Sequence, residues 1–339
     1  MAASTVILAD IGGTNARFAL AGGGGTGEVT RLAVADFASF EDALLHFLRM
    51  RPPPSAPVAA AIAVAGPVSR GQGALTNSHW RFDEAAIASR FGLRRARLLN
   101  DFEALAWGLP LLRPEHVIPV TGPHPAVDYM QRPRSGPVAA NNGRLVALGP
   151  GTGLGVACYV PDGGGVVIAS EGGHVNAPSW SGRIDAIIDW LRAELGHVSV
   201  ERMVSGQGLE NVYRALAALE GRPARLRDAA AITAAALEAR DPVAVETLDI
   251  FCAMLGEAAG NFALTYGATG GVYVAGGIAP RIAGRLQASQ FRERFVAKGR
   301  FRDYLEPVPT WLVVHPNPTF LGLEAVASRA VMDAAGVSG

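Results

Sequence analysis

Two short glycine-rich stretches of the chain have the pattern of one structural device used twice. DIGGTNARFAL covers residues 10–20 and LGPGTGLGVAC covers residues 148–158. Each has an apolar strand, a tight turn on Gly-Thr and a second strand, and Thr14 of the first stands 138 positions before Thr152 of the second. Glycine leaves the backbone uncovered, so N–H groups in such turns can approach an anion closely, and the Thr hydroxyl adds a donor. The repeat therefore predicts a duplicated half-molecule with two phosphate-binding turns facing one cleft.

The composition narrows the classes of protein. A chain of 339 residues is longer than one hydrophobic core usually supports, so two domains are expected. Its 30 basic and 30 acidic residues cancel without a run of one sign, which argues against a nucleic-acid partner and favours small molecules. The N-terminus lacks the basic segment of a secretory signal, and no apolar run reaches membrane-spanning length. We therefore expect neither secretion nor a membrane partner.

Cysteine and lysine are both scarce. Cys158 and Cys252 are too few for a disulfide framework and too far apart to suggest a ligand pair, which fits a reducing cytosol. Lys298 is the single lysine, so neither a GxxxxGK phosphate loop nor the strand lysine of a protein kinase can be placed on the chain. Any nucleotide must be held in another way.

The order of strand and helix patterns predicts an α/β fold with mixed sheets. A meander of strands leads each half, and strands then alternate with helices. The continuous apolar run VAAAIAVAG, residues 58–66, predicts a strand buried on both faces. A region rich in Pro, Gly and Asn between residues 110 and 144 separates the halves, so we expect a small domain at residues 1–111 and a large one at residues 112–318. A C-terminal helix at about residues 319–337 would pack back on the small domain.

The segment GGGGTG, residues 22–27, matches the GxGxxG pattern of dinucleotide-binding sites. That function needs a helix directly after the glycines, whereas the alternating strand pattern EVTRLAV follows here. We therefore interpret it as a hairpin turn.

Polar residues end two strands of the first half. Asp10 precedes the first Gly-Thr turn, where it could cap the turn or hold Mg²⁺ through water, and its spacing leaves both open. Asn100 and Asp101 close the strand ARLLND, at the carboxyl end where open α/β sheets bind ligands. Asp101 suffices as N-cap of a helix starting at Phe102, and it could equally accept the proton of an attacking hydroxyl while Asn100 orients the substrate.

Three further sets of candidates lie in the second half. Glu171 and His174 stand on the loop SEGGHVNAP, where binding residues concentrate, although such a pair is commonly only solvated. Glu201, taken singly, is expected as a charge at the start of a helix. Gly276 and Gly277 join a strand to a helix in GGVYVAGGIAPR; they could lie against a base or ribose, but tight packing of strand on helix is the simpler interpretation.

Along almost the entire chain, and in order, these motifs resemble the bacterial glucokinases of the hexokinase and actin superfamily. DIGGTNARFAL resembles the superfamily's first phosphate motif, LGPGTGLGVA its second and VYVAGGIAPR its adenosine motif. LNDFEALAWG, SEGGHVNAP and SVERMVSGQG resemble the sugar-binding elements of glucokinases. Kinases and repressors of the related ROK group carry a cysteine-rich zinc motif after the EGGH-like loop, and NAPSWSGRID has no cysteine. The resemblance is therefore to the zinc-free glucokinases.

This resemblance implies an actin-like ATPase (ribonuclease H-like) fold, with two α/β domains with mixed sheets around a central cleft. It implies ATP-dependent phosphorylation of D-glucose at the 6-hydroxyl, the first step of glycolysis, with Mg²⁺ as cofactor, in a cytoplasmic homodimer. Carried over by position, it assigns Asp101 as catalytic base and, as ligands of the sugar hydroxyls, Asn100, Glu171, His174 and Glu201. It assigns to the nucleotide and its phosphates Asp10, Gly12, Gly13, Thr14, Asn15, Gly151, Thr152, Gly276 and Gly277, with Asp10 holding Mg²⁺ through water.

Two alternatives stay open at this point. One is a kinase for another hexose or an amino sugar, since a ring with one inverted hydroxyl would engage similar side chains. The other is a non-catalytic, sugar-responsive regulator on the same fold. Such a regulator would need a DNA-binding extension, and none is expected ahead of the first phosphate strand.

Overall fold

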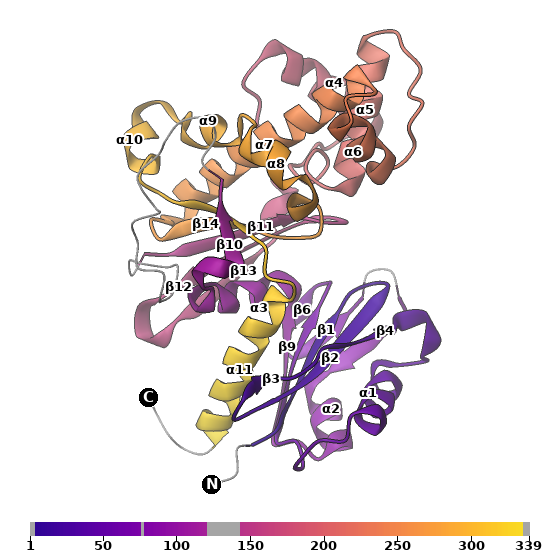
Figure 1. Ribbon diagram of the computed structural model, residues 1–339, viewed down its shortest axis with the longest axis vertical. Coiled ribbons are helices and arrows are strands. Elements are labelled where there is room, and N and C mark those ends of the chain that lie inside the picture. Colours follow the sequence, from indigo (N-terminus) through magenta and orange to yellow (C-terminus); the bar gives the residue numbers. More distant parts are fainter. Residues whose placement is uncertain (1–3, 76–77, 121–142, 335–339) are drawn as a thin grey trace. The chain divides into compact units, whose positions relative to one another are not determined.

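The computed structural model describes residues 4–75, 78–120 and 143–334 of the chain. Its residues form two compact units. The first comprises Met1–Leu111, Asp162–Ala169 and Pro316–Gly339, and the second comprises Leu112–Pro161 and Ser170–His315. Each unit has its own sheet and core (Figure 1). The linker region expected between the halves falls largely within residues 121–142, outside the described residues.

The first unit is built on a mixed sheet of order β3-β2-β1-β5-β9, with β4 also paired to β2. β1 runs antiparallel to β2 and parallel to β5, and β5 runs parallel to β9. Every residue of β1 and β5 is buried, which confirms the prediction for the apolar run at residues 58–66. The strands are β1 (Val6–Ile11), β2 (Asn15–Gly22), β3 (Gly25–Thr26), β4 (Thr30–Ala33), β5 (Ala59–Val64) and β9 (Arg95–Asn100).

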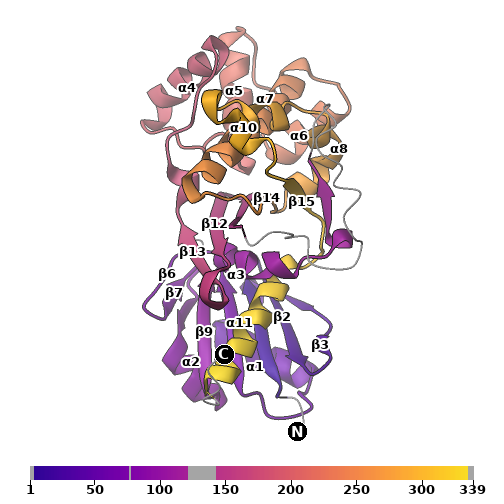
Figure 2. The same cartoon turned by 90° about the vertical axis from the view of Figure 1, so that its left-hand side faces the viewer.

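Helices cover both faces of this sheet (Figure 1; Figure 2). On one face α1 and α2 enclose a core in which the ring of Phe18 packs on those of Phe40 and Phe47. On the other face lie α3 and the C-terminal α11. The helices are α1 (Phe40–Met50), α2 (Glu84–Phe91), α3 (Asp101–Gly108) and α11 (Pro318–Ala334).

Side-chain caps set where the first two helices begin. The Ser39 hydroxyl accepts a hydrogen bond from the Asp42 amide at the start of α1, and the Asp83 carboxylate accepts one from the Ala86 amide at the start of α2. Such caps satisfy amides that have no partner within the helix.

α11 packs on α3, β1 and β5. The two helices approach most closely at Gly322, where a Cβ would overlap the carbonyl oxygen of Ala104. The absence of a side chain at Gly322 therefore sets how closely the C-terminal helix is held against α3.

A small antiparallel sheet in the first unit was missed by the sequence patterns. Its strands have two or three residues, too few for an alternating pattern to show, and Arg70 and Gly71 turn the chain between two of them with φ of 50° and 72°. The strands are β6 (Val68–Ser69), β7 (Gln72–Ala74) and β8 (Arg81–Asp83). Short 3₁₀ turns complete the unit at η1 (Val34–Asp36), η2 (Leu109–Leu111) and η5 (Asp162–Gly164).

A second sheet has the order β10-β15-β14-β11-β12-β13, and its strands other than β13 belong to the second unit. β11 runs antiparallel to β12 and parallel to β14, and β14 runs parallel to β15. The strands are β10 (Val117–Pro119), β11 (Leu145–Pro150), β12 (Leu154–Val160), β13 (Val166–Ser170), β14 (Gly271–Val274) and β15 (Thr310–Val313).

The two Gly-Thr hairpins have the same topology but different register. β1 pairs with β2 up to Ile11 and Ala16, whereas β11 pairs with β12 up to Pro150 and Leu154. Four residues lie between the last paired residues of the first hairpin, and three lie between those of the second. The strand pairing of the second hairpin is therefore shifted by one residue from the alignment that places Thr14 on Thr152, 138 positions later. The repeated strand, turn and strand are confirmed, and the second turn is one residue tighter.

Helices of the second unit enclose one large core around α7, which is buried over most of its length. The helix expected after Gly276 and Gly277 begins as the 3₁₀ turn η7 (Ala279–Ile282). α5 begins at Gly206, where the Ser205 hydroxyl caps the Gly208 amide. The remaining elements are η3 (Pro114–His116), η6 (Gly172–His174), α4 (Gly182–Leu195), α5 (Gly206–Leu219), α6 (Ala229–Leu237), α7 (Pro242–Tyr266), α8 (Ala283–Gln287), α9 (Phe291–Val296), η8 (Gly299–Phe301) and α10 (Arg302–Leu305).

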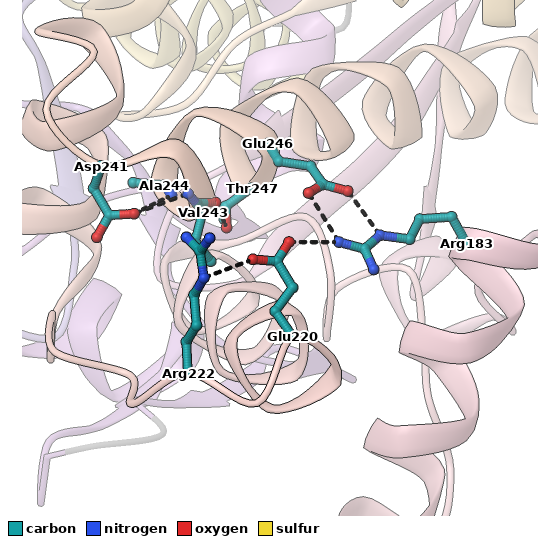
Figure 3. A network of polar contacts seen from close by, with 8 residues as sticks. All are labelled: Arg183, Glu220, Arg222, Asp241, Val243, Ala244, Glu246 and Thr247. Carbon is teal, nitrogen blue, oxygen red and sulfur yellow. Dashed lines mark hydrogen bonds and ion pairs between the residues drawn. The ribbon is translucent and has the colours of Figure 1, made fainter.

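An ion-pair network ties three of these helices together (Figure 3). Arg183 of α4 donates to both carboxylate oxygens of Glu246 on α7, at 2.8 and 2.9 Å, and to Glu220 at the end of α5, at 3.0 Å. Arg222 pairs with the other oxygen of Glu220. The members are partly exposed, so solvent weakens each pair.

Two sequence expectations concern segments outside the candidate site. GGGGTG forms the turn between β2 and β3, with Ala21 paired to Thr26, which confirms the hairpin interpretation. No helix in the part of the chain that the structure describes is both long and apolar enough to cross a bilayer.

Candidate active site

In the first unit the candidate residues gather at one edge of the sheet. β1, β5 and β9 run parallel, and Ile11, Val64 and Asn100 stand in register at their carboxyl ends. Neighbouring strands lie about 4.8 Å apart, so the backbones of Asp10 and Asp101 lie on the order of 10 Å apart along this edge. The carboxyl ends of parallel strands are where open α/β sheets bind ligands.

Asn100 and Asp101 take different positions from those expected. Asn100 is the N-cap of α3: its Oδ1 accepts from the amides of Phe102 at 2.9 Å and Glu103 at 3.4 Å, and its Nδ2 donates to the Gly66 carbonyl at 3.3 Å. α3 therefore starts at Asp101, and the interpretation of Asp101 as the cap is wrong. From the first position of the helix, the Asp101 carboxylate also accepts from the Phe102 amide, at 3.0 Å.

Asp10 is a charge buried beneath the first turn, with 5% of its surface exposed. Burial raises the pKa of its carboxyl, and the positive charge of Arg17 opposes the rise. Oδ2 lies 2.6 Å from Nη2 of Arg17, yet no contact among the described residues has hydrogen-bond geometry at that oxygen. Sequence reasoning missed Arg17; the signal was its place opposite Asp10 in the hairpin, since cross-strand neighbours interact.

The pKa of the Asp101 carboxyl is strongly raised. Burial raises its pKa from 3.8 to about 6, the negative charge of Asp10 adds to the rise, and hydrogen bonds from the Phe102 amide and the Asn100 side chain oppose it. A carboxyl whose pKa lies near neutral pH is suited to accept a proton during a reaction and to release it afterwards.

The first Gly-Thr turn is open. The Gly12 amide donates to the Asn15 carbonyl at 2.9 Å, and the Asn15 side chain accepts from Arg31 at 2.8 Å. A Cβ on Gly13 would meet nothing within 4 Å, and its φ is not positive. Neither packing nor backbone conformation explains glycine at this position, whereas the approach of a ligand to the backbone does. Thr14 is exposed beside it.

The second Gly-Thr turn has the same property. The Gly151 amide donates to the Gly153 carbonyl at 2.8 Å, and Thr152 is exposed at the tip. A Cβ on Gly151 would meet nothing within 4 Å. This turn, like the first, presents backbone that no side chain covers.

Gly276 and Gly277 follow the neighbouring parallel strand β14 and differ from each other. Gly276 has a φ of 84°, and a Cβ there would clash with the Pro150 carbonyl. Gly276 is thus tightly packed, but against the end of β11 and not between strand and helix as expected. Tight packing does not explain Gly277, where a Cβ would meet nothing within 4 Å.

The second unit brings Glu171, His174 and Glu201 together. The Glu201 amide donates to the Gly173 carbonyl at 2.9 Å, which joins the two loops. His174 lies between the carboxylates, with Nε2 at 3.9 Å from Glu171 and Nδ1 at 3.8 Å from Glu201. These separations exceed hydrogen-bond length, so the facing atoms remain available to a ligand's hydroxyl groups.

Glu201 does not occupy the position expected for it. α5 has no acidic residue in its first turn, so the interpretation of Glu201 as a helix-start charge is wrong. Its Oε2 accepts a hydrogen bond from the Leu154 amide at 2.8 Å, directly after the second Gly-Thr turn. A Cβ on Gly153 would overlap the same oxygen. Sequence reasoning missed this role of Gly153, for which the third glycine of GPGTG was the available signal.

Known proteins are similar to this chain over nearly its whole length. A family model described as Glucokinase matches residues 7–330. A glucokinase of Paramagnetospirillum magneticum is 42% identical over 326 residues, which cover 95% of this chain and 97% of that protein. The crystal structure of a glucokinase from an Antarctic psychrotroph has a TM-score of 0.83 and 36% identity, over 96% of this chain and 99% of that one. A ROK family glucokinase from Streptomyces griseus was solved in complex with glucose and AMPPNP. It has a TM-score of 0.61 and 20% identity, over 96% of this chain and 100% of that one.

The fold is therefore that of the sugar kinases with an actin-like ATPase architecture, as the sequence resemblance implied. The more distant likeness supports the fold alone. Within this class, the family model and the 42% identity decide the assignment: the chain belongs to the glucokinase family.

Proposed function

We propose that the chain transfers the γ-phosphoryl group of ATP to the 6-hydroxyl of D-glucose, giving glucose 6-phosphate and ADP. The observation that carries the proposal is Asp101, a carboxylate with its pKa raised to about 6 at the carboxyl edge of the parallel strands, beside an open Gly-Thr turn. Membership of the glucokinase family supports glucose as acceptor and ATP as donor.

Asp101 is the proposed catalytic base. As the 6-oxygen of glucose forms its bond to the γ-phosphorus, the bond from that phosphorus to the β–γ bridging oxygen breaks, ADP leaves, and the hydroxyl proton passes to the Asp101 carboxylate. Such transfers have a loose transition state, so the enzyme mainly aligns donor and acceptor and neutralises charge. With a pKa of about 6, roughly nine-tenths of Asp101 is ionised at pH 7.

We assign the sugar hydroxyls to Glu171, His174, Glu201 and Asn100. The first three present acceptors and a ring N–H at separations that leave their facing atoms unpaired with each other. One of the two Nδ2 protons of Asn100 bonds the Gly66 carbonyl, which leaves the other for the sugar. Polar groups that only one arrangement of hydroxyls can satisfy discriminate between sugars.

We assign the phosphates to the two Gly-Thr turns. The amides of Gly13, Thr14 and Thr152 donate to no other described residue, and the glycines beside them leave the backbone open. Backbone N–H groups in turns form anion-binding concavities without a lysine. Gly277, open in the same way, would lie against the nucleoside.

The residues present fit Mg²⁺ as cofactor. Magnesium takes one or two protein carboxylates and keeps most of its water and phosphate ligands, so it needs no cage of side chains. No group of three or more His, Cys, Asp or Glu side chains that could hold a metal occurs among the described residues. Asp10, whose Oδ2 also pairs with Arg17 at 2.6 Å, would supply a carboxylate of the required kind, through water. When bound, Mg²⁺ would neutralise charge on the phosphates of ATP.

A coupled assay that detects glucose 6-phosphate, run with glucose, ATP and Mg²⁺, tests the function. Glucose, mannose, fructose and N-acetylglucosamine compared at equal concentration decide between glucose and the alternative of another hexose or amino sugar. We expect the highest kcat/KM with glucose. No turnover of any sugar by folded, glucose-binding protein would favour the non-catalytic regulator and overturn the proposal.

We further propose a cytoplasmic homodimer that acts at the entry to glycolysis. Cys158 and Cys252 are both free and buried, which fits a reducing compartment. Analytical ultracentrifugation checks the dimer.

A further inference from the structure

We propose that Glu201 is a positioning residue that couples glucose binding to the second phosphate turn. The inference rests on the proposed function, where Glu201 is a ligand of the sugar, and adds a second duty for the same side chain. The two duties fall on different oxygens of one carboxylate.

The contacts of the carboxylate divide in this way. Oε2 accepts the Leu154 amide at 2.8 Å, and Leu154 is the first residue after the turn. Oε1 faces Nδ1 of His174 at 3.8 Å, on the sugar side. The side chain is 26% exposed, so it is held by these neighbours and still open to a ligand.

The backbone around Glu201 braces the same connection. The Ser205 hydroxyl donates to the Glu201 carbonyl at 2.8 Å, and the next amide, that of Gly206, donates to the Gly151 carbonyl at 2.9 Å. The Glu201 segment is thus bonded to the turn on both sides, at Gly151 and at Leu154. A displacement of Glu201 therefore reaches the turn through two routes.

Gly153 shows that the sequence reserves space for this contact. Its φ is not positive, yet a Cβ on it would overlap Oε2 of Glu201. At Gly151, in the same turn, a Cβ would meet nothing within 4 Å. A side chain at Gly153 would therefore require the Glu201 carboxylate to move.

The expected consequence is positive coupling between the two substrates. Glucose held by Oε1 fixes the carboxylate, and Oε2 then fixes the turn that receives the phosphates. Coupling free energies are reciprocal, so nucleotide must strengthen glucose binding by the same factor. We expect Mg²⁺ and AMPPNP to lower the Kd for glucose by about fivefold or more.

Gly153→Ala and Gly151→Ala form a matched pair for calorimetric titration with glucose in the absence of nucleotide. Neither residue is assigned to the sugar. Gly153→Ala must displace the Glu201 carboxylate, so we expect its Kd for glucose to rise about fivefold or more, while Gly151→Ala stays within about twofold of the wild type. Equal affinity of the two variants for glucose would overturn the coupling.

Glu201→Asp and Glu171→Asp give a second test that does not depend on the folding of Gly153→Ala. Both keep the charge and lose one methylene group, and both weaken glucose binding. Only Glu201→Asp should abolish the effect of AMPPNP on the Kd for glucose, because the shortened side chain cannot contact both the Leu154 amide and the sugar. Coupling retained in Glu201→Asp would refute the inference.

The wild-type protein separates the two hypotheses. If it phosphorylates glucose but the variants behave alike, the coupling is wrong and the proposed function stands. If it neither binds nor phosphorylates glucose, both are wrong.

Discussion

Replacing the proposed base in Asp101→Asn should change two measurable quantities in opposite directions: the free energy of unfolding rises and kcat falls. The rise in the pKa of Asp101 from 3.8 to about 6 disfavours the ionised form in the folded protein by about two units, or about 3 kcal/mol. Asparagine has nearly the same shape, keeps an oxygen for the Phe102 amide and does not ionise. At pH 8 we expect the substitution to increase the free energy of unfolding by up to about 3 kcal/mol. It should also lower kcat about 10²- to 10⁴-fold, the usual range for loss of a general base.

The gain in stability has a defined pH dependence. Below pH 3.8 the carboxyl is protonated in both folded and unfolded protein, so wild type and variant are alike. Between pH 3.8 and about 6 the unfolded chain has released the proton that the folded protein still holds, and wild-type stability therefore falls as the pH rises. Above about pH 6 the difference keeps its full value.

Urea unfolding followed by circular dichroism measures this, without nucleotide or Mg²⁺, at pH 4.5, 6 and 8, with the transition of each unit fitted separately. Asp83→Asn is the matched control, because the Ala86 amide lowers the pKa of Asp83 and asparagine caps helices equally well. It should give no stabilisation at pH 8. An Asp101→Asn protein no more stable than the wild type at pH 8, or equally stabilised at pH 4.5 and pH 8, would refute the raised pKa.

The same carboxyl predicts the pH dependence of activity. At saturating ATP, kcat/KM for glucose should fall about tenfold per pH unit below pH 6, because only ionised Asp101 accepts the proton. The residual activity of Asp101→Asn should lack this acid limb. If the limb persists in the variant, it belongs to another group and Asp101 is not the base.

Three further outcomes follow from particular contacts. Glu171→Gln and His174→Ala should raise KM for glucose more than KM for ATP, and the reverse pattern in initial-rate kinetics would move these residues to the nucleotide. Gly322→Ala should destabilise the protein by about 1–3 kcal/mol or more in urea unfolding, because its Cβ overlaps the Ala104 carbonyl; unchanged stability would show that α11 does not pack so closely on α3. Arg183→Ala should cost no more than about 1 kcal/mol per ion pair lost, with the loss shrinking at high salt, since its pairs are partly exposed; a larger, salt-independent loss would contradict that account.

Local patterns were sufficient to predict the elements that carry the site. The buried strand β5 is a continuous apolar run and β1 is apolar except for Asp10, and such signals depend only on residues close in sequence. The turn at residues 22–27 was also decided locally, by the strand pattern that follows the glycines.

Pairings across strands and between loops could not be predicted in this way. Asn100 and Asp101 are adjacent, so which of them caps α3 depends on whether the helix starts one residue earlier or later. The sequence spacing fits either choice. The bond from Leu154 to Glu201 joins residues 47 positions apart, and only the folded sheet brings them together. The roles of the candidate residues in catalysis stay predictions, since contacts within the protein define which groups are available and not what they bind.

The single lysine of the chain, Lys298, forms an ion pair within the protein. Lys298 bonds the carboxylate and the backbone carbonyl of Glu257, and both side chains are about nine-tenths buried. Burial lowers the pKa of Lys298, and the bonds to Glu257 oppose that shift, so the ammonium serves packing between α7 and the end of α9. In the proposed reaction, amides of the Gly-Thr turns and the proposed Mg²⁺ would therefore neutralise the triphosphate. Because amides are fixed dipoles that need no side-chain ordering, the proposed turns at the open glycines 13 and 151 would supply the preorganised part of that neutralisation.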